Sequence, residues 1–328
     1  MLAPARHSLR ADCSAGGFQV VSPVWPIGRR IRLVTIASVF VTGSTGTVGC
    51  EVVRALSARQ FRVRIGDRNP SRSRALFGDD VEAVHFDYGD RSTFAGVAGS
   101  DALFLLRPPA IANVKTTLLP FIDEAYRLGV KHVVFLSVAG AETNRLVPHH
   151  AVEQHLFRRR GWTVLRPGFF AQNLGDAYLR DLVDEDRLYV PAGRGRVSFV
   201  DVRDIAEVTA IAFQSLDAHD GRAYTLTGHE AISFGEVAST LTQLLGRPIR
   251  YQPASIVGYV RHLRARDMTW AQAGVQTVLH VGLRFGQAER VDPTLERLLH
   301  RPSRTVRSYI EDHRMLWIRP VGHHLIGA

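Results

Sequence analysis

The 328-residue sequence is poor in several residues on which whole classes of protein depend. Its two cysteines, Cys13 and Cys50, form no disulfide framework and lack the spacing of metal ligands, which favours the reducing cytoplasm as the location. No run of about 18 consecutive apolar residues occurs, so we expect no membrane-spanning helix. Of 41 Lys and Arg residues only Lys115 and Lys131 are lysines, which limits the acid–base chemistry open to the protein.

The net charge of +10 invites a nucleic-acid-binding interpretation. Arginine carries nearly all of the positive charge, a bias typical of codon usage in GC-rich genomes. The run RRR at 158–160 directly precedes Gly161, where a helix is expected to end and cations stabilise the helix dipole. We therefore do not expect nucleic-acid binding.

Residues 1–33 carry five arginines against one acid, Asp12, and show no clear period. The pair Arg29-Arg30 before the apolar stretch 33–41 superficially resembles a twin-arginine or secretory signal. Cleavage after that stretch would remove the first predicted strand of the fold. We therefore expect 1–33 to be disordered or a wrongly annotated extension, with translation starting near Val34.

From about residue 36, short apolar segments alternate with amphipathic ones. Strands are predicted at 36–42, 61–65, 81–86, 102–106, 132–136 and 162–165, and helices at 47–59, after Pro70, and at 91–98, 113–128 and 149–160. Strands that are apolar throughout and separated by helices indicate a parallel sheet covered on both faces. The fold class predicted is α/β, with a Rossmann-type doubly wound parallel sheet and a smaller, mostly helical substrate lobe.

The alternation of predicted strands and helices becomes less regular after Pro167, and this change sets the expected division of the chain into domains. Later strands are predicted at 197–200 and 223–226, and later helices at 204–213 and 234–245. We assign 34–172, with a return at about 197–215, to the sheet domain, 173–196 and 216–317 to the substrate lobe, and 318–328 to a tail.

The stretch TGSTGTVG, residues 42–49, joins the first strand to the first helix. Gly43 permits a tight turn, Gly46 lets phosphates approach the backbone, and Gly49 lets the helix pack close to the sheet. Free N–H groups at the helix start suit a pyrophosphate, and a Walker loop is excluded because no Gly-Lys-Ser/Thr follows. The alternative is a plain strand–helix turn. The candidate phosphate-binding residues are Gly43, Ser44, Thr45, Gly46, Thr47 and Val48.

This loop resembles that of the NmrA-like group of atypical short-chain dehydrogenases, and matches continue from residue 36 to about 317. The further stretches are RIGDRNPSR, FDYGD, FLLRPPA, HVVFLSVAGAE, HHAVE, VLRPGFFAQN, FVDVRDIAEV, AYTLTGHEAISFGEVA, LLGRPIRY and LLHRPSRTVRSYIEDH. The group includes NAD(P)H quinone oxidoreductases, isoflavone-reductase-like enzymes and ergot-alkaloid imine reductases. The resemblance therefore implies an NAD(P)H-dependent oxidoreductase but no particular substrate.

The end of the second strand bears on the choice of dinucleotide. An acid there accepts hydrogen bonds from the ribose 2′-OH, whereas an arginine pairs with a 2′-phosphate, and the chain has both, Asp67 and Arg68. The family has arginine at the position of Arg68, so NADP(H) is favoured over NAD(H), although Asp67 would repel a phosphate; alternatively both face solvent. Further cofactor positions implied by the resemblance are Asp87, Tyr88, Leu106, Arg107 and Pro167.

Short-chain dehydrogenases usually protonate their product with a Tyr-x-x-x-Lys pair, which this chain lacks. The family alignment places Val147 and Ala151 at those positions. One interpretation is a reductase of a small acceptor such as a quinone or imine, which needs no strong acid. Its candidate catalytic residues are Ser137 and His150, and its candidate substrate-binding residues are Phe169, Phe170 and Asn173.

The missing pair also supports a second interpretation, a non-catalytic NAD(P)-binding redox sensor that acts on a protein partner. Fungal NmrA is of this type. No metal site is expected, because His150 and His155 do not share one helix face and His229-Glu230 lacks the second histidine of H-E-x-x-H.

Overall fold

The structure is a computed structural model that describes residues 36–78 and 81–318. The expectations for residues 1–33 and nearly all of the tail, 319–328, lie outside the described residues. The centre of the molecule is a seven-stranded sheet in the order β11-β6-β5-β4-β1-β2-β3, and every neighbouring pair is parallel. Its strands are β1 (Ser38–Thr42), β2 (Arg62–Asp67), β3 (Glu82–His85), β4 (Ala102–Leu106), β5 (His132–Leu136), β6 (Trp162–Pro167) and β11 (Arg222–Leu226).

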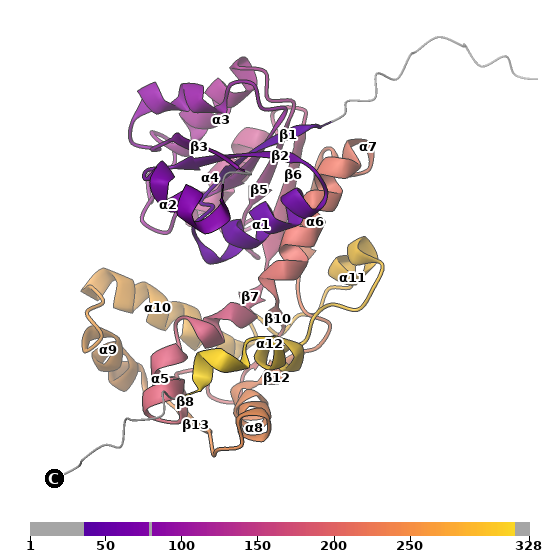
Figure 1. Cartoon of the computed structure of the whole chain (residues 1–328). Helices are drawn as coiled ribbons and strands as arrows, with labels where there is room; N and C mark the ends of the chain where they lie inside the picture. The colour runs from indigo at the N-terminus through magenta and orange to yellow at the C-terminus, as the bar shows by residue number, and fades with distance from the viewer. Residues whose placement is uncertain (1–35, 79–80, 319–328) are drawn as a thin grey trace, which may run out of the picture. The chain divides into compact units, whose positions relative to one another are not determined.

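Helices cover both faces of this sheet (Figure 1). Val39 and Val41 of β1 point to the face packed by α1 (Thr47–Ala58) and α6 (Val202–Gln214). Phe40, between them, points to the opposite face, where it meets α3 (Leu118–Arg127); α4 (Pro148–Leu156) packs on the same side. Because successive side chains alternate across a strand, an uninterrupted apolar strand serves two cores at once. The predicted α/β fold with a doubly wound parallel sheet is confirmed.

The strand order reverses at β1, which lies between β2 and β4. In open parallel sheets, the crevice outside the carboxyl ends of the strands at such a reversal is where ligands bind. The segments that follow β1, β2 and β4 are therefore brought together at one edge of the sheet. The helix α2 (Pro70–Phe77) and the 3₁₀ segment η1 (Arg91–Val97) follow β2 and β3.

The remaining elements build a smaller lobe with a separate apolar core. Phe234 and Trp317 are fully buried in that core, and Phe199 packs against Phe169. Its short strand pairs are β7 (Phe169–Phe170) with β10 (Phe199–Val200), β9 (Arg196–Val197) with β12 (Ile232–Ser233), and β8 (Arg187–Val190) with β13 (Arg250–Pro253). Its helical segments are η2 (Ala171–Gly175), α5 (Leu179–Asp184), α8 (Phe234–Leu245), α9 (Ile256–Arg264), α10 (Trp270–Gly282), η3 (Leu283–Phe285), α12 (Val306–Asp312) and η4 (Arg314–Trp317).

The strand β11 corrects the expected division of the chain. We assigned 216–317 to the substrate lobe, but Arg222–Leu226 pairs with β6 as the edge strand of the main sheet. The helix α11 (Thr294–Leu299) also packs on the sheet domain, with Leu295 in the core beside α1 and α6. The short helix α7 (Leu216–His219) leads from α6 into β11. The chain thus returns to the sheet domain more often than its local pattern indicated.

Three predicted elements differ most from the structure in their limits. The strand predicted at 197–200 is two strands, because Val197 pairs with Ile232 and Phe199 pairs with Phe169. The helix predicted at 113–128 begins at Leu118, after a turn closed by the N–H of Leu119 on the carbonyl of Val114. The helix predicted at 149–160 ends at Leu156. No helix among the described residues is long and apolar enough to cross a membrane.

Candidate cofactor and substrate site

A cavity of about 780 Å³ lies at the carboxyl ends of the strands. It extends from the loop after β1 to the segment after β7 and gathers most of the predicted site residues. The predicted residues that line it are Gly43, Thr45, Gly46, Thr47, Val48, Asp67, Arg68, Asp87, Tyr88, Leu106, Arg107, Ser137, Phe170 and Asn173. Its size suits a ligand as large as a dinucleotide with room for a second molecule.

The glycine loop places the first turn of α1 at the cavity wall. Gly43 has φ +67°, which favours glycine, and Gly46 caps α1 with its N–H bonded to the Gly43 carbonyl at 3.1 Å. A Cβ on Gly49 would lie 2.1 Å from that same carbonyl oxygen, whereas one on Gly46 would meet only that oxygen, at 3.4 Å. Gly49 is therefore needed for packing, and Gly46 keeps open the space in front of the helix N-terminus.

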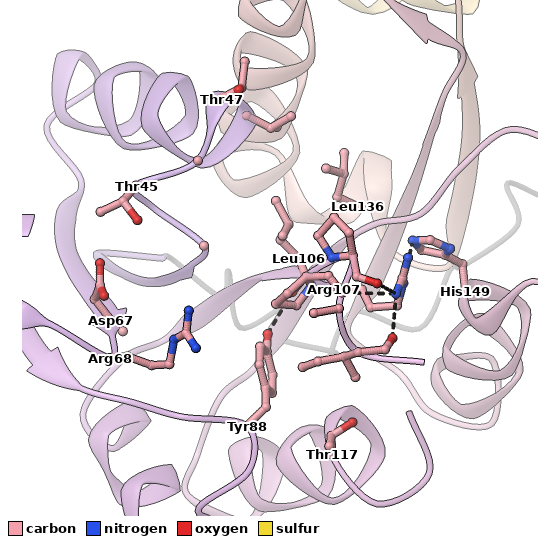
Figure 2. A pocket seen from close by; sticks show the side chains of 18 of the residues that line it. Thr45, Thr47, Asp67, Arg68, Tyr88, Leu106, Arg107, Thr117, Leu136 and His149 are labelled. Carbon is pink, nitrogen blue, oxygen red and sulfur yellow. Dashed lines mark hydrogen bonds between the residues drawn. The ribbon is translucent and has the colours of Figure 1, made fainter. Parts of the chain in front are cut away.

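Asp67 and Arg68 play different parts at the end of β2. One carboxylate oxygen of Asp67 accepts from the backbone N–H of Asn69 at 2.8 Å, and the other accepts from the hydroxyl of Ser73 at 2.7 Å. Asp67 thus stabilises the first turn of α2. The side chain of Arg68 extends on the cavity side, below Thr45 and Asp67 in the close view (Figure 2).

The aromatic ring of Tyr88 closes the cavity behind the ends of β3 and β4. Its hydroxyl donates to the carbonyl of Leu106 at 2.9 Å, and burial raises its pKa well above the ordinary value (Figure 2). Its ring packs against Phe86 and Phe121 in the sheet core. Tyr88 is therefore a fixed wall of the site and no acid at neutral pH. The carboxylate of Asp87 accepts from the backbone N–H of Gly89 at 2.8 Å.

Arg107 and His149 form a pair that the sequence did not predict. The guanidinium of Arg107 donates to the ring Nε2 of His149 at 3.2 Å and to the carbonyls of Pro108, Pro109 and Ile111 at 3.1, 3.3 and 2.5 Å (Figure 2). Burial, helped by the charge of Arg107, lowers the pKa of His149 to about 4. Because Nε2 accepts from Arg107, the neutral ring carries its proton on Nδ1, which has no partner among the described residues.

Ser137 directly follows β5 and belongs to a buried polar network. Its hydroxyl donates to Oε1 of Glu153 at 2.5 Å, and the same carboxylate receives two bonds from Arg166, at 3.0 and 2.7 Å. Ser137 is buried and Glu153 is fully buried, so the ion pair is shielded from water. The Ser137 proton is committed to Glu153, and its oxygen can only accept a hydrogen bond from a molecule in the cavity.

Four predicted site residues do not line the cavity: Ser44, His150, Pro167 and Phe169. The ring of His150 bonds to the carbonyl of Ala141 at 2.8 Å, and its neighbour His149 faces the cavity instead. One residue turns a helix position by about 100°, so adjacent histidines cannot share a face. Phe169 packs against Phe199 and His280 in the smaller lobe. The placement of His150 and Phe169 does not fit the roles expected of them.

The far end of the cavity is lined by the segment after β7. Phe170 presents a half-buried ring there, with Asn173 beside it. Gln172 is buried, and its side-chain amide bonds within the protein. It donates to the carboxylate of Asp201 at 2.9 Å and accepts from the N–H of Val202 at 3.1 Å. Asp176 completes this end and is exposed. Within 36–78 and 81–318, no group of three His, Cys, Asp or Glu residues is arranged to hold a metal ion.

A parallel doubly wound sheet with a glycine loop at its switch point defines a Rossmann-type α/β protein. The chain belongs to the NmrA-like family, whose model matches residues 36–272.

Several relatives of this family cover most of the chain. The sequence is 30% identical to NAD(P)H azoreductase of Xenophilus azovorans over 285 residues, which is 84% of this chain and 97% of that protein. It is 24% identical to quinone oxidoreductase 2 of Escherichia coli over 278 residues, 81% and 95% of the two chains.

Solved structures share the fold. Citrobacter sp. triphenylmethane reductase complexed with NADP(H) superposes with a TM-score of 0.75 at 22% identity, over 84% of this chain and 99% of that one. The E. coli quinone oxidoreductase complexed with NADPH superposes with a TM-score of 0.74 at 24% identity, over 84% and 99%. At these identities the likeness concerns the fold alone.

Proposed function

We propose that the protein is an NAD(P)H-dependent oxidoreductase that transfers hydride to a small electrophilic acceptor such as a quinone or imine. The observation that carries this proposal is a single cavity that runs from the open N-terminus of α1 to an aromatic wall at Phe170. A dinucleotide needs the first feature and a flat acceptor needs the second. Relatives named as an NAD(P)H azoreductase and a quinone oxidoreductase support the same reaction class.

The residues present fit a nicotinamide dinucleotide. The first turn of α1, with no side chain at Gly46, would hold the pyrophosphate, and the ends of β2 and β3 would hold the adenosine half. The opposite half would then lie toward Ser137 and His149. A bound reduced nicotinamide supplies the hydride, and the protein binds and orients both partners.

NADP(H) is favoured over NAD(H) by the different roles of Asp67 and Arg68. Both carboxylate oxygens of Asp67 accept hydrogen bonds within the β2–α2 turn, so this acid orders the turn. Arg68 lines the cavity, and its side chain makes no hydrogen bond to other residues within 36–78 and 81–318. A guanidinium there would pair with a 2′-phosphate.

The proton donors available at the site suit acceptors that are already electrophilic. No Tyr-x-x-x-Lys pair is present in the sequence, and the Ser137 hydroxyl donates its hydrogen bond to Glu153. We infer that Ser137 acts as a hydrogen-bond acceptor that orients the bound ligand, and that any proton the product needs comes from water. A small-molecule acceptor and a cytoplasmic location are part of this proposal.

The test is NADPH oxidation, followed at 340 nm as is usual for this cofactor, with a quinone and an imine as acceptors. We expect steady consumption that requires the protein and stops when the acceptor is exhausted. If NADPH binds but no acceptor of either class is reduced, the enzyme proposal is wrong and the redox-sensor interpretation stands in its place. The matched control is Gly46→Ala, which should weaken NADPH binding about tenfold or more and lower turnover at the same NADPH concentration.

A further inference from the structure

One helix pair of the smaller lobe exposes many large apolar side chains. Of the fourteen that are exposed in the described part of the chain, seven lie between residues 256 and 285, in α9, α10 and η3. These seven are Ile256, Val257, Trp270, Val275, Val278, Leu279 and Phe285. Single exposed apolar side chains are common on proteins, whereas a concentration of them on one surface marks a contact with another molecule.

The outer face of α10 carries an apolar strip formed by Ala271, Val275, Val278 and Leu279. At about 100° per residue, these four positions share one face of the helix. Val278 is 71% exposed, and Phe285, just beyond the helix, is 80% exposed.

The inner face of the same helix is also apolar or neutral, because Ala273, Thr277 and His280 are buried there. None of the thirteen residues of α10 is an Asp, Glu, Lys or Arg. A surface helix usually places charged residues on its outer face. The outer face of α10 therefore lacks the residues typical of a helix in contact with water alone.

Arginines border the strip where α9 packs against α10. The two helices lie side by side and antiparallel, since the ring of Tyr259 lies 5.4 Å from that of His280 and the guanidinium of Arg264 lies 4.8 Å from the indole of Trp270 (Figure 1). Arg261 lies one turn before Arg264, on the same face of α9. It is exposed and forms no hydrogen bond or ion pair with another described residue.

The charge around the strip is positive on balance. Arg284, next to Phe285, donates to the carbonyls of Pro191 and Ala254 at 2.6 and 3.0 Å, and these partners leave its charge in place. Arg266, by contrast, is paired with acids of the neighbouring α5 segment. Between residues 256 and 290 the chain has five arginines against two acids: Arg261, Arg264, Arg266, Arg284 and Arg290 against Asp267 and Glu289.

We propose that the α9–α10 pair is a docking surface for an anionic lipid membrane. Apolar side chains with a tryptophan at the edge and arginines beside them are the combination with which a helix lies in the plane of an anionic bilayer. The apolar strip would enter the boundary between headgroups and acyl chains, and Arg261 and Arg264 would meet lipid phosphates. The contact is peripheral, because no helix among the described residues is long and apolar enough to cross a membrane.

Charge favours this partner over a second copy of the chain. Each copy carries a net charge of +10, so two copies repel each other, whereas an anionic membrane attracts both. The strip also offers no charged side chain with which a second copy could form an ion pair.

The experiment measures co-sedimentation of the full chain with vesicles of phosphatidylcholine alone and with 30% phosphatidylglycerol. We expect binding to the anionic vesicles that weakens with added salt. Val278→Asp should weaken it about tenfold or more, and Arg261→Gln about fivefold, as expected for one arginine near an anionic surface. The matched control is Leu146→Asp, at a side chain that is 93% exposed outside the helix pair, and it should bind like the wild type.

The fluorescence of Trp270 gives a readout at the strip itself. The indole is 69% exposed, so anionic vesicles should move its emission to shorter wavelength, and Trp270→Phe should remove that shift. Vesicle binding that is absent, or that Val278→Asp and Arg261→Gln leave unaltered, would overturn the inference. A dimer in light scattering that Val278→Asp dissociates, without vesicle binding, would identify a second copy as the partner and also overturn it. None of these measurements involves NADPH, so the proposed function is tested separately.

Discussion

The hydroxyl of Ser137 donates to the carboxylate of Glu153 across 2.5 Å, and this contact determines what Ser137 can do. Arg166 holds the carboxylate from the other side, so the three side chains form a buried unit at the ends of β5 and β6. The serine oxygen is presented to the cavity as an acceptor. A serine at this position, which in isolation suggests an acid or a nucleophile, becomes an orienting group.

Glu153→Gln should destabilise the protein strongly. The change removes the buried carboxylate that pairs with Arg166 and leaves this arginine only Glu142, at 3.5 Å, so we expect a loss of about 3 kcal/mol, whereas Ser137→Ala removes one hydrogen bond to a charged group, about 1.5–3 kcal/mol. Denaturant unfolding of both single variants and the double variant measures these losses. The double variant should lose less than the sum of the singles, because the two residues share one contact. Strict additivity would show that the contact contributes nothing.

Gly46→Ala and Gly49→Ala should separate binding from stability. A Cβ at Gly49 would overlap the Gly43 carbonyl, so we expect a loss of about 3 kcal/mol in unfolding free energy. A Cβ at Gly46 meets only the Gly43 carbonyl oxygen, at the ordinary contact distance of 3.4 Å, so stability should change little while NADPH affinity falls about tenfold or more. Thermal melts and NADPH titrations of the two variants provide the comparison. Equal affinity in Gly46→Ala and wild type would place the phosphates elsewhere.

Arg68→Ala should affect the two dinucleotides differently. Loss of a charge-assisted bond to the 2′-phosphate is expected to weaken NADPH binding about tenfold and to leave NADH binding nearly unchanged. Titrations with both cofactors measure this, with Arg261→Ala on α9 as a control for the loss of one exposed arginine. If both cofactors weaken equally, Arg68 does not read the 2′-phosphate.

His132 should make stability fall on acidification. Burial lowers its pKa from 6.5 to about 4, so between about pH 6.5 and pH 4 the unfolded chain binds a proton that the folded chain does not. In this window, stability decreases as pH falls, by up to about 1.4 kcal/mol per pH unit from this residue. His132→Gln should therefore show a shallower loss of unfolding free energy between pH 7 and pH 4.5. Parallel curves for variant and wild type would exclude this cause. His149 has the same direction of shift and adds to the loss in both proteins.

The sheet and the glycine loop could be predicted because their signals are local. Apolar strands, glycine spacing and helix starts are determined by residues within a few positions of each other, as with Gly43 and Gly46, whose backbone hydrogen bond closes the loop. No local pattern in the sequence indicates which strand another strand will pair with. Residues 223–226 were therefore recognised as a strand but assigned to the wrong lobe, since only the fold reveals that β11 pairs with β6.

The site residues that the sequence missed depend on rotation and on distant partners. Which of His149 and His150 faces the cavity depends on their angular positions around α4. The predicted boundaries of this helix did not determine those positions. The role of Asp67 in ordering the turn depends on Ser73, six positions later, which becomes a partner only once α2 forms. The sequence held one signal for the network around Ser137. Glu153 lies on a predicted helix, and Arg166 directly follows the strand predicted after that helix.

The most direct test of the account is a titration of the purified protein with NADPH, followed by the change in nicotinamide fluorescence. The claim that amide groups at the start of α1 hold paired phosphates predicts saturable binding of one molecule per chain, weakened about tenfold or more in Gly46→Ala. A fluorescence signal that never saturates, or one that Gly46→Ala leaves unaltered, would contradict it.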